Sequence, residues 1–286
     1  MLVGPVDVFE YYSRRLGMAL PSHPIVESSL LPSSQIHPGL LSAGSGRAAA
    51  RAIEAGVELA RAGVVSALVT APISKHALHR GGVRFAGQTE MLQRLTGARD
   101  VAMVLVSRSL RVGLVTIHVP VKRIASLLSR KLLRGKIETI HQSLVRDWRI
   151  RKPRIAVLAL NPHAGEAGDI GTEENRIITP VIRSLSQAME ISGPFPADAF
   201  FARSGPGSCD AVIAMYHDQG LIPLKMSAEG RAVNVSAGLP IVRTSPDHGT
   251  AFDIAGKGRA SPDSMIEAIH LAVRIAKNRQ AGLTGR

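Results

Sequence analysis

The sequence predicts an α/β fold with a largely parallel sheet. Short apolar segments of strand length alternate along the chain with longer segments of helical period. Such alternation is typical of sheets whose parallel strands are joined by helices. The chain has 286 residues, 45% of them apolar and 20% charged, which is a globular balance. This length allows one large or two ordinary domains with a substantial core.

The predicted strands are short apolar runs, and the predicted helices repeat apolar residues with a helical period. We expect strands within residues 65–73, 100–106, 111–120, 153–163, 209–218 and 238–246. We expect helices within residues 49–63, 89–97, 121–148, 173–190 and 261–279. The last helix is preceded by a capping sequence that starts at Ser261, and the helix at 121–148 is amphipathic with a basic, solvated face.

Composition limits where the protein acts. No apolar run approaches the roughly 20 residues that a membrane-spanning helix needs, and residues 1–17 lack the basic, apolar and small-residue order of a signal peptide. The single cysteine, Cys209, excludes an internal disulfide and a cysteine metal site. We therefore expect a cytoplasmic protein with no membrane partner.

The net charge of +13 has three possible explanations. A basic surface attracts the phosphates of nucleic acids, but aromatic residues make up only 3% of the chain, which argues against a base-stacking platform. A generally basic surface without a specific partner is the second explanation. We favour the third, attraction of small anionic substrates, and expect no nucleic-acid partner.

The most informative residues follow the predicted strands, because ligands of parallel sheets gather beyond the carboxyl ends of the strands. His118, His163 and His217 each follow such a strand. One histidine at a strand end is usually structural. Three histidines at the ends of strands in one sheet are suited to converge on Zn²⁺ or a similar divalent ion, with a coordination position left open for catalysis.

Two weaker features lie near the end of the chain. A glycine-rich loop at residues 247–262 would allow close approach of backbone to a ligand, although such loops are often only tight connections. Lys225, Asn234 and Arg243 are suited to bind phosphate or carboxylate, with a solvated surface position as the alternative. The chain has neither a Gly-x-Gly-x-x-Gly fingerprint after its first strand nor a Gly-Lys-Ser/Thr phosphate loop, which disfavours a standard nucleotide site of either kind.

Several long motifs together resemble the 4-hydroxythreonine-4-phosphate dehydrogenase family of vitamin B6 synthesis. They are TAPISKHALHRGGVRFAGQTEML, LNPHAGEAGDIGTEE, GPFPADAFF, AMYHDQGLIPLK and VNVSAGLPIVRTSPDHGTAFDIAGKG. The resemblance covers nearly the whole chain. It implies two α/β/α domains that flank a cleft, as in isocitrate and isopropylmalate dehydrogenases. The expected domains are residues 1–105 with 235–286 on the cofactor side, and residues 106–234 for metal binding and dimerisation.

The resemblance also implies a chemistry and its residues. NAD would take a hydride from the hydroxyl-bearing carbon of 4-(phosphooxy)-L-threonine, a small phosphorylated hydroxy acid, and the resulting β-keto acid would lose CO₂. A homodimer with its active sites at the interface is implied. The implied metal ligands, for zinc, magnesium or cobalt, are His118, His163 and His217. The implied substrate contacts are Gln88, Thr89, Lys225, Asn234 and Arg243. The implied cofactor loop contains His248, Gly249, Thr250, Asp253 and Gly256.

Asp218, Asp247 and Lys225 are the further catalytic candidates. The two aspartates would fix imidazole tautomers beside the metal, with a helix or loop cap as the alternative role. Lys225 would balance the negative charge of the substrate. The residues leave the general base unassigned.

The chain departs from the family pattern in two places. Gln88 stands where the family usually has histidine, and glutamine cannot become cationic toward a phosphate. The usual opening strand and its Gly-Pro-rich loop have no counterpart at the start, and absence of a central strand would expose a sheet edge. The alternatives are therefore a dehydrogenase of phosphorylated threonate or erythronate, or of a dihydrodiol carboxylate, and a truncated member without catalysis.

Overall fold

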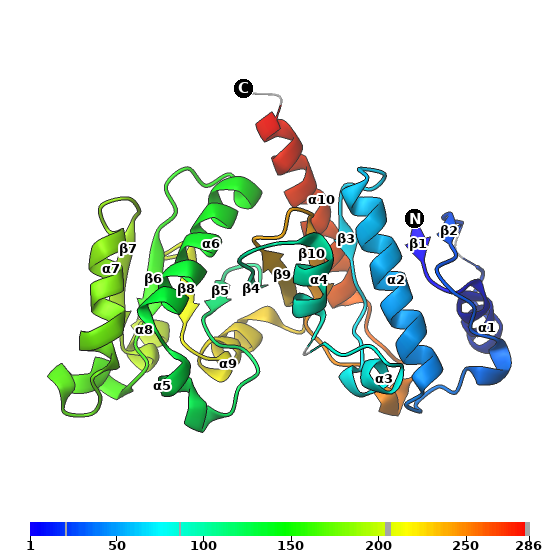
Figure 1. Cartoon of the computed structure of the whole chain (residues 1–286), viewed down its shortest axis with the longest axis horizontal. Coiled ribbons are helices and arrows are strands. Elements are labelled where there is room, and N and C mark those ends of the chain that lie inside the picture. The colour runs from blue at the N-terminus through cyan, green and yellow to red at the C-terminus, as the bar shows by residue number, and fades with distance from the viewer. Residues whose placement is uncertain (21, 86, 204–206, 284–286) are drawn as a thin grey trace. The chain divides into compact units, whose positions relative to one another are not determined.

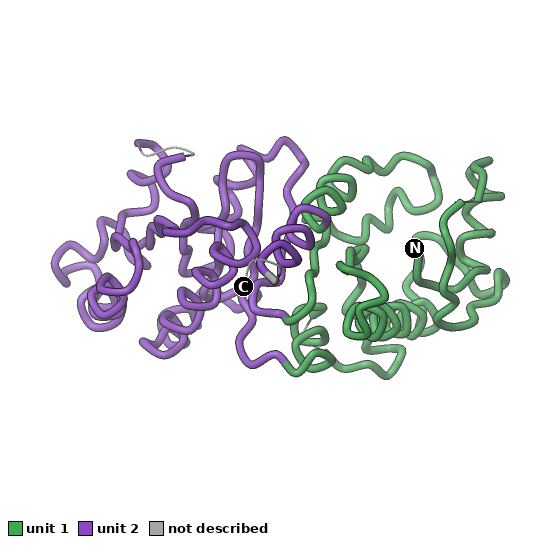
Figure 2. Tube along the Cα trace, turned by 90° about the horizontal axis from the view of Figure 1, so that it is seen from above, with its two compact units in different colours: residues 1–97, 240–272 green, residues 98–239, 273–286 purple. Residues whose placement is uncertain are grey.

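The computed structural model describes residues 1–20, 22–85, 87–203 and 207–283. It confirms the α/β class. The chain forms two compact units, which Figure 2 distinguishes by colour. Unit 1 contains residues 1–97 and 240–272, and unit 2 contains residues 98–239 and 273–286. No helix in the described ranges combines the length and hydropathy needed to cross a membrane.

Unit 1 is built from two short parallel strand pairs and helices around them (Figure 1). β1 (Leu2–Val3) pairs with β2 (Ile25–Val26), and β3 (Leu68–Val69) pairs with β10 (Arg243–Pro246). The helical elements are α1 (Val6–Leu16), η1 (Ser33–Gln35), α2 (Ala43–Arg61), α3 (Lys75–Arg80), α4 (Gln88–Thr96), η5 (Phe252–Ile254) and the first part of α10 (Asp263–Leu283).

Helix α2 organises unit 1. It begins after Ser42, whose hydroxyl caps the helix by accepting the backbone N–H of Ser45 at 3.0 Å. Its buried face includes Ala50, Ile53 and Val57, which recur with helical spacing. At Gly46 the backbone of α3 passes so close that a β-carbon would overlap a carbonyl group. Small residues thus let α2 and α3 pack backbone to backbone.

Unit 2 holds a six-stranded run of sheet in the order β9-β4-β5-β8-β6-β7. Its strands are β4 (Ala102–Val106), β5 (Arg111–Leu114), β6 (Ile155–Leu158), β7 (Ile191–Phe195), β8 (Ala211–Ala214) and β9 (Val233–Ala237). The pairs among β5, β8, β6 and β7 are parallel, as expected. β4 is antiparallel to both β5 and β9. A tight turn causes this reversal, because Ser107 and Leu110 close it with backbone and side-chain hydrogen bonds.

Helices cover both faces of this sheet. α6 (Arg130–Trp148) packs on one face, where a β-carbon at Gly113 of β5 would collide with Ile140. α9 (His217–Ala228) packs on the other, where a β-carbon at Gly220 would collide with Val112. Adjacent strand residues point to opposite faces, so β5 packs against α6 on one face and against α9 on the other. The remaining helical elements are η2 (Val121–Arg123), α5 (Ile124–Leu127), η3 (Pro162–Gly168), η4 (Glu174–Ile178), α7 (Thr179–Leu185) and α8 (Ala197–Arg203).

Two predicted helices are interrupted. The segment 121–148 divides at Leu128 and Ser129, where Ser129 is extended and caps α6 by accepting the N–H of Leu132 at 3.2 Å. The segment 173–190 begins as the π-helix η4, continues as α7 and ends at Leu185. In both cases the apolar period continues across a change of backbone geometry, so periodicity alone does not reveal the break.

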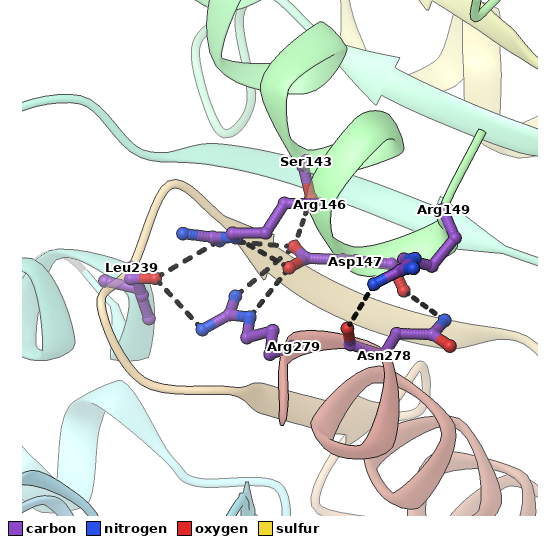
Figure 3. A network of polar contacts seen from close by, with 7 residues as sticks. All are labelled: Ser143, Arg146, Asp147, Arg149, Leu239, Asn278 and Arg279. Carbon is purple, nitrogen blue, oxygen red and sulfur yellow. Dashed lines mark hydrogen bonds and ion pairs between the residues drawn. The ribbon is translucent and has the colours of Figure 1, made fainter. Parts of the chain in front are cut away.

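A buried aspartate joins the end of α6 to α10 (Figure 3). Asp147 is 1% exposed and accepts two hydrogen bonds each from Arg146 and Arg279, at 2.7 to 3.3 Å. Ser143 donates another at 2.6 Å, and the Asp147 carbonyl accepts from Asn278 at 2.8 Å. Burial raises the pKa of the Asp147 carboxyl, but the two guanidinium groups outweigh burial and hold it below its usual value.

Replacement of Asp147 by asparagine is expected to cost about 3 kcal/mol of unfolding free energy at pH 7, because it leaves two guanidinium groups around a neutral buried amide. Since the folded pKa of Asp147 lies below the unfolded value of about 3.9, this contribution is fully present above that value and is lost as pH falls through the folded pKa. The measurement is urea unfolding of both proteins at pH 7 and at acid pH.

Glu138→Gln, which breaks an exposed ion pair to Arg134 on the same helix, is the matched control and should cost less than about 1 kcal/mol. Equal losses from the two substitutions at pH 7 would contradict a stabilising role for the buried network.

Candidate active site

Three neighbouring parallel strands of unit 2 carry the predicted metal ligands. β5, β8 and β6 lie in this order, with Leu114 opposite Ala214 and Val157 opposite Ile213. His118 follows β5, His217 follows β8 and His163 follows β6. Because the strands are parallel, their carboxyl ends lie at one edge of the sheet. The strand-end placement expected from the sequence is therefore present.

His118 and His217 lie close together. Their ring centroids are 5.7 Å apart and the planes are inclined by 41°. Nδ1 of His217 lies 2.6 Å from Oδ1 of Asp218, which leaves Nε2 of that ring as the nitrogen available to a metal ion. β8 ends at Ala214, and His217 is the first residue of α9, because the chain enters the helix two residues after Met215.

Hydrogen bonds fix the strand ends that carry these histidines. The Thr116 hydroxyl donates to the Met215 carbonyl at 2.7 Å, which joins the ends of β5 and β8. The Gln219 side chain donates to the Ala159 carbonyl at 2.6 Å and accepts the Met215 N–H at 2.7 Å, which joins β8 to β6. Sequence reasoning missed both residues. The one feature of the sequence that could have identified them is that each lies two residues from one of the candidate histidines.

His163 lies apart from the other two histidines. It is exposed on the turn that follows β6, in a left-handed backbone conformation with φ of 52°. Among residues 1–20, 22–85, 87–203 and 207–283, no three histidine, cysteine, aspartate or glutamate side chains are grouped so that one chain could hold a metal ion. The complete set of three ligands stays a prediction.

Lys225 and Asn234 are the other candidates in unit 2. Lys225 is exposed on α9, on the helix that His217 begins. Asn234 lies in β9, and its Oδ1 is buried without a hydrogen-bond partner. A buried acceptor of this kind costs free energy until a donor reaches it. Asn234 is therefore chemically suited to accept a hydrogen bond from a bound molecule.

Unit 1 buries an arginine at the start of β10. Arg243 is 2% exposed, and its Nε and Nη2 donate to the Thr70 hydroxyl at 3.2 and 2.8 Å. Nη2 also donates to Oε1 of Gln88. Burial lowers the pKa of Arg243 to about 10, so the guanidinium remains charged at neutral pH. A positive charge held in this way is suited to bind an anion.

Gln88 and Thr89 are the first two residues of α4, beside this arginine. The Gln88 amide donates to the Ala71 carbonyl at 3.0 Å, and its oxygen accepts from Arg243 and from the Thr70 hydroxyl. These partners fix the orientation of the side chain. A helix N-terminus favours anions through its unpaired N–H groups and its dipole. Gln88 and Thr89 therefore lie at a helix N-terminus that is suited to bind an anion.

The predicted cofactor loop follows β10 in unit 1. The Asp247 N–H donates to the Ser264 hydroxyl at 3.2 Å, which ties the start of the loop to α10. His248 is exposed, and its Nδ1 lies 3.0 Å from the Gly249 carbonyl. Gly256 has φ of 70°, and its carbonyl accepts from Arg15 of α1 at 3.1 Å. NAD binding by Thr250, Asp253 and their neighbours stays a prediction, as does a catalytic role for Asp218, Asp247 and Lys225.

Comparison with known proteins gives consistent matches over most of the chain. The relative from Acidithiobacillus ferrooxidans named 4-hydroxythreonine-4-phosphate dehydrogenase is 41% identical over 98% of this chain and 89% of its own length. A Bradyrhizobium diazoefficiens protein named putative D-threonate 4-phosphate dehydrogenase is 46% identical over 86% of this chain and 74% of its own.

Among solved structures, 4-hydroxythreonine-4-phosphate dehydrogenase from Klebsiella pneumoniae matches with a TM-score of 0.84 and 37% identity, over 96% of this chain and 88% of that one. The family model described as pyridoxal phosphate biosynthetic protein PdxA matches residues 12–272. The chain therefore belongs to the PdxA family, as the motifs predicted, and its named relatives are dehydrogenases.

Proposed function

We propose that this protein oxidises 4-(phosphooxy)-L-threonine with NAD in pyridoxal phosphate biosynthesis, and that the product loses CO₂ to give 3-amino-2-oxopropyl phosphate. The observation that carries the proposal is the close pair of His118 and His217 at neighbouring strand ends, in a chain of the PdxA family. Imidazole pairs of this kind suit zinc and related divalent ions.

His118, His163 and His217 would hold the divalent ion, with zinc, magnesium or cobalt as candidates. When bound, such an ion lowers the pKa of a substrate hydroxyl and stabilises negative charge on oxygen. Asp218 fixes the ring of His217 through its hydrogen bond, so the Nε2 lone pair is directed away from the carboxylate. The donor set therefore fits a divalent ion.

The phosphate of the substrate would bind in unit 1, at Arg243, Gln88 and Thr89. The buried guanidinium supplies positive charge, and the start of α4 supplies backbone N–H groups. Lys225 would balance the charge of the carboxylate, and Asn234 would accept a hydrogen bond from the substrate.

NAD would supply the hydride acceptor, and we propose that its adenine side would be held by the loop of unit 1 at His248, Gly249, Thr250, Asp253 and Gly256. The loop is tied at Asp247 to α10 and at Gly256 to α1, which leaves the exposed residues between these ties accessible to a ligand. Hydride leaves the hydroxyl-bearing carbon while the hydroxyl proton is lost. Asp218 and Asp247 are the candidates to orient groups for that proton transfer.

A second candidate substrate is a phosphorylated threonate. The Bradyrhizobium diazoefficiens relative is named for D-threonate 4-phosphate. Gln88, whose oxygen accepts from Arg243 and Thr70, does not decide between the two substrates, because both carry the phosphate that this group would face. Both candidates carry the phosphate on the same four-carbon acid skeleton, so the distinction concerns the substituent on carbon 2, an amino group in the threonine and a hydroxyl group in the threonate.

We propose a homodimer in which a second copy completes the metal site. His118 and His217 pair within one chain, while His163 is exposed and outside that pair. Ile222 and Met226 on α9, one helical turn apart, are 59% and 80% exposed. An apolar helix face beside His217 is suited to contact another subunit. We place the dimer in the cytoplasm, with a small phosphorylated molecule as its partner.

Purified protein is expected to form NADH from NAD and 4-(phosphooxy)-L-threonine, and removal of the metal by a chelator is expected to abolish turnover. Absorbance at the NADH band measures the rate, with D-threonate 4-phosphate assayed in parallel. Restoration of turnover by added Zn²⁺, Mg²⁺ or Co²⁺ identifies the ion. If only D-threonate 4-phosphate were oxidised, it would be the substrate in place of 4-(phosphooxy)-L-threonine. Undiminished turnover after chelation would contradict the metal role.

His217→Ala is expected to lower metal affinity by about 100-fold or more, because it removes one of the proposed ligands. Metal content after dialysis and the thermal melting curve are the two measurements. His270→Ala, which removes an exposed histidine on α10, is the matched control and should leave both unchanged. Retention of metal by the His217 variant would exclude His217 as a ligand.

Subunit mixing tests the shared site. His118→Ala and His163→Ala homodimers should each be inactive. After unfolding and joint refolding, the mixture should recover about a quarter of wild-type turnover. Half of the dimers are then mixed, and each mixed dimer has all three metal ligands intact at one of its two sites. No recovery, in a mixture shown to contain mixed dimers, would mean that one chain supplies all three ligands.

A further inference from the structure

We propose that Glu174 is the residue that positions His163, because its buried carboxylate holds the strained turn on which His163 lies. This inference rests on the proposed role of His163 as a metal ligand. Glu174 is 2% exposed and begins the π-helix η4, eleven positions after His163 in the chain.

The turn that carries His163 has an unusual backbone. Residues 163 to 167 all have positive φ, with values of 52°, 54°, 79°, 44° and 59°. Gly165 is the one glycine among them, so four of the five successive left-handed residues are L-residues. This conformation crowds the β-carbon and is ordinarily adopted by single residues. Such strain persists where surrounding contacts enforce it, and it occurs often at functional sites.

Glu174 supplies contacts that enforce the turn. Its Oε1 accepts the backbone N–H groups of Leu160 and Asn161, each at 2.8 Å. Its Oε2 accepts from Nδ2 of Asn161 at 2.9 Å. The carboxylate therefore fixes the two residues that immediately precede Pro162, and the left-handed segment begins directly after that proline.

Packing around the carboxylate leaves no space for a side chain. A β-carbon at Gly165 would lie 2.6 Å from Oε2 of Glu174, and one at Gly171 would overlap the Asn161 side chain. The far side of the turn is held as well, since Asn175 donates to the Ala167 carbonyl at 3.0 Å and Ile170 donates to Gly165 at 3.2 Å. Glu174 and Asn175 thus hold opposite ends of the turn from one element.

The π-helix makes this arrangement possible. η4 runs from Glu174 to Ile178, and wide turns of this type are frequent at functional sites. Ile178 at its end is fully buried, so the element is anchored in the core of unit 2. A rigid connection therefore runs from the core through Glu174 to the turn that presents His163.

The test is metal binding by variants of the full-length protein, with Co²⁺ as the probe. Glu174→Ala removes all three acceptor contacts and should weaken Co²⁺ binding about 10- to 100-fold. Glu174→Gln should lie between this variant and wild type, since the amide oxygen still accepts the two backbone N–H groups. Glu173→Gln, which replaces a second carboxylate that accepts from the same Asn161 side chain by a neutral amide, is the matched control and should stay within about twofold of wild type.

A double-mutant cycle separates positioning from general stabilisation. If Glu174 acts through His163, Glu174→Gln should have no further effect on Co²⁺ binding in a His163→Ala background. An equal loss in both backgrounds, or wild-type binding by Glu174→Ala, would overturn the inference. Thermal melts show whether each variant folds. If Glu174→Ala does not fold, Co²⁺ binding by Glu174→Gln decides the test. Failure of wild-type protein to bind Co²⁺ would overturn the proposed function together with this inference.

Discussion

The close pair of His118 and His217 depends on the parallel adjacency of β5 and β8, and β6 lies parallel to β8 on its other side. Each strand is only four residues long, and each is buried along its whole length or nearly so. Parallel pairing brings their carboxyl ends to one edge, where His118 and His217 lie close together although they are far apart in the sequence, while His163 stays outside that pair. α6 and α9 bury the two faces of these strands, so the edge is where polar side chains can reach a ligand.

Rigidity at this edge comes from side chains that have no role in the proposed chemistry itself. Thr116 and Gln219 connect the strand ends, and Glu174 holds the turn after β6. A metal ligand must be held in place before the ion arrives, because ordering it on binding would cost affinity. The same logic applies in unit 1, where Thr70 and Gln88 hold the buried guanidinium of Arg243 in one orientation.

The sequence predicts the strands, the three histidines behind them and the family, because apolar runs and motifs are local signals. It does not reveal the reversal of β4, which depends on a turn closed by Ser107, or the start of α9 at His217. The contacts of Glu174 and Gln219 span 14 and 60 residues, so no local pattern predicts them. Helix propensity does not predict the left-handed turn at residues 163–167 either, since three of its members are common formers of right-handed helices, Ala164, Glu166 and Ala167.

The central claim is that histidines from these strand ends bind a divalent ion that oxidation requires. X-ray absorption spectroscopy of the zinc-loaded protein tests it most directly, because imidazole ligands give a characteristic scattering pattern with Zn–N distances of about 2.0 to 2.1 Å. We predict three imidazoles per ion in wild-type protein and one fewer in His163→Ala. An oxygen-only coordination sphere, or a pattern that His118, His163 and His217 variants leave unchanged, would contradict the account.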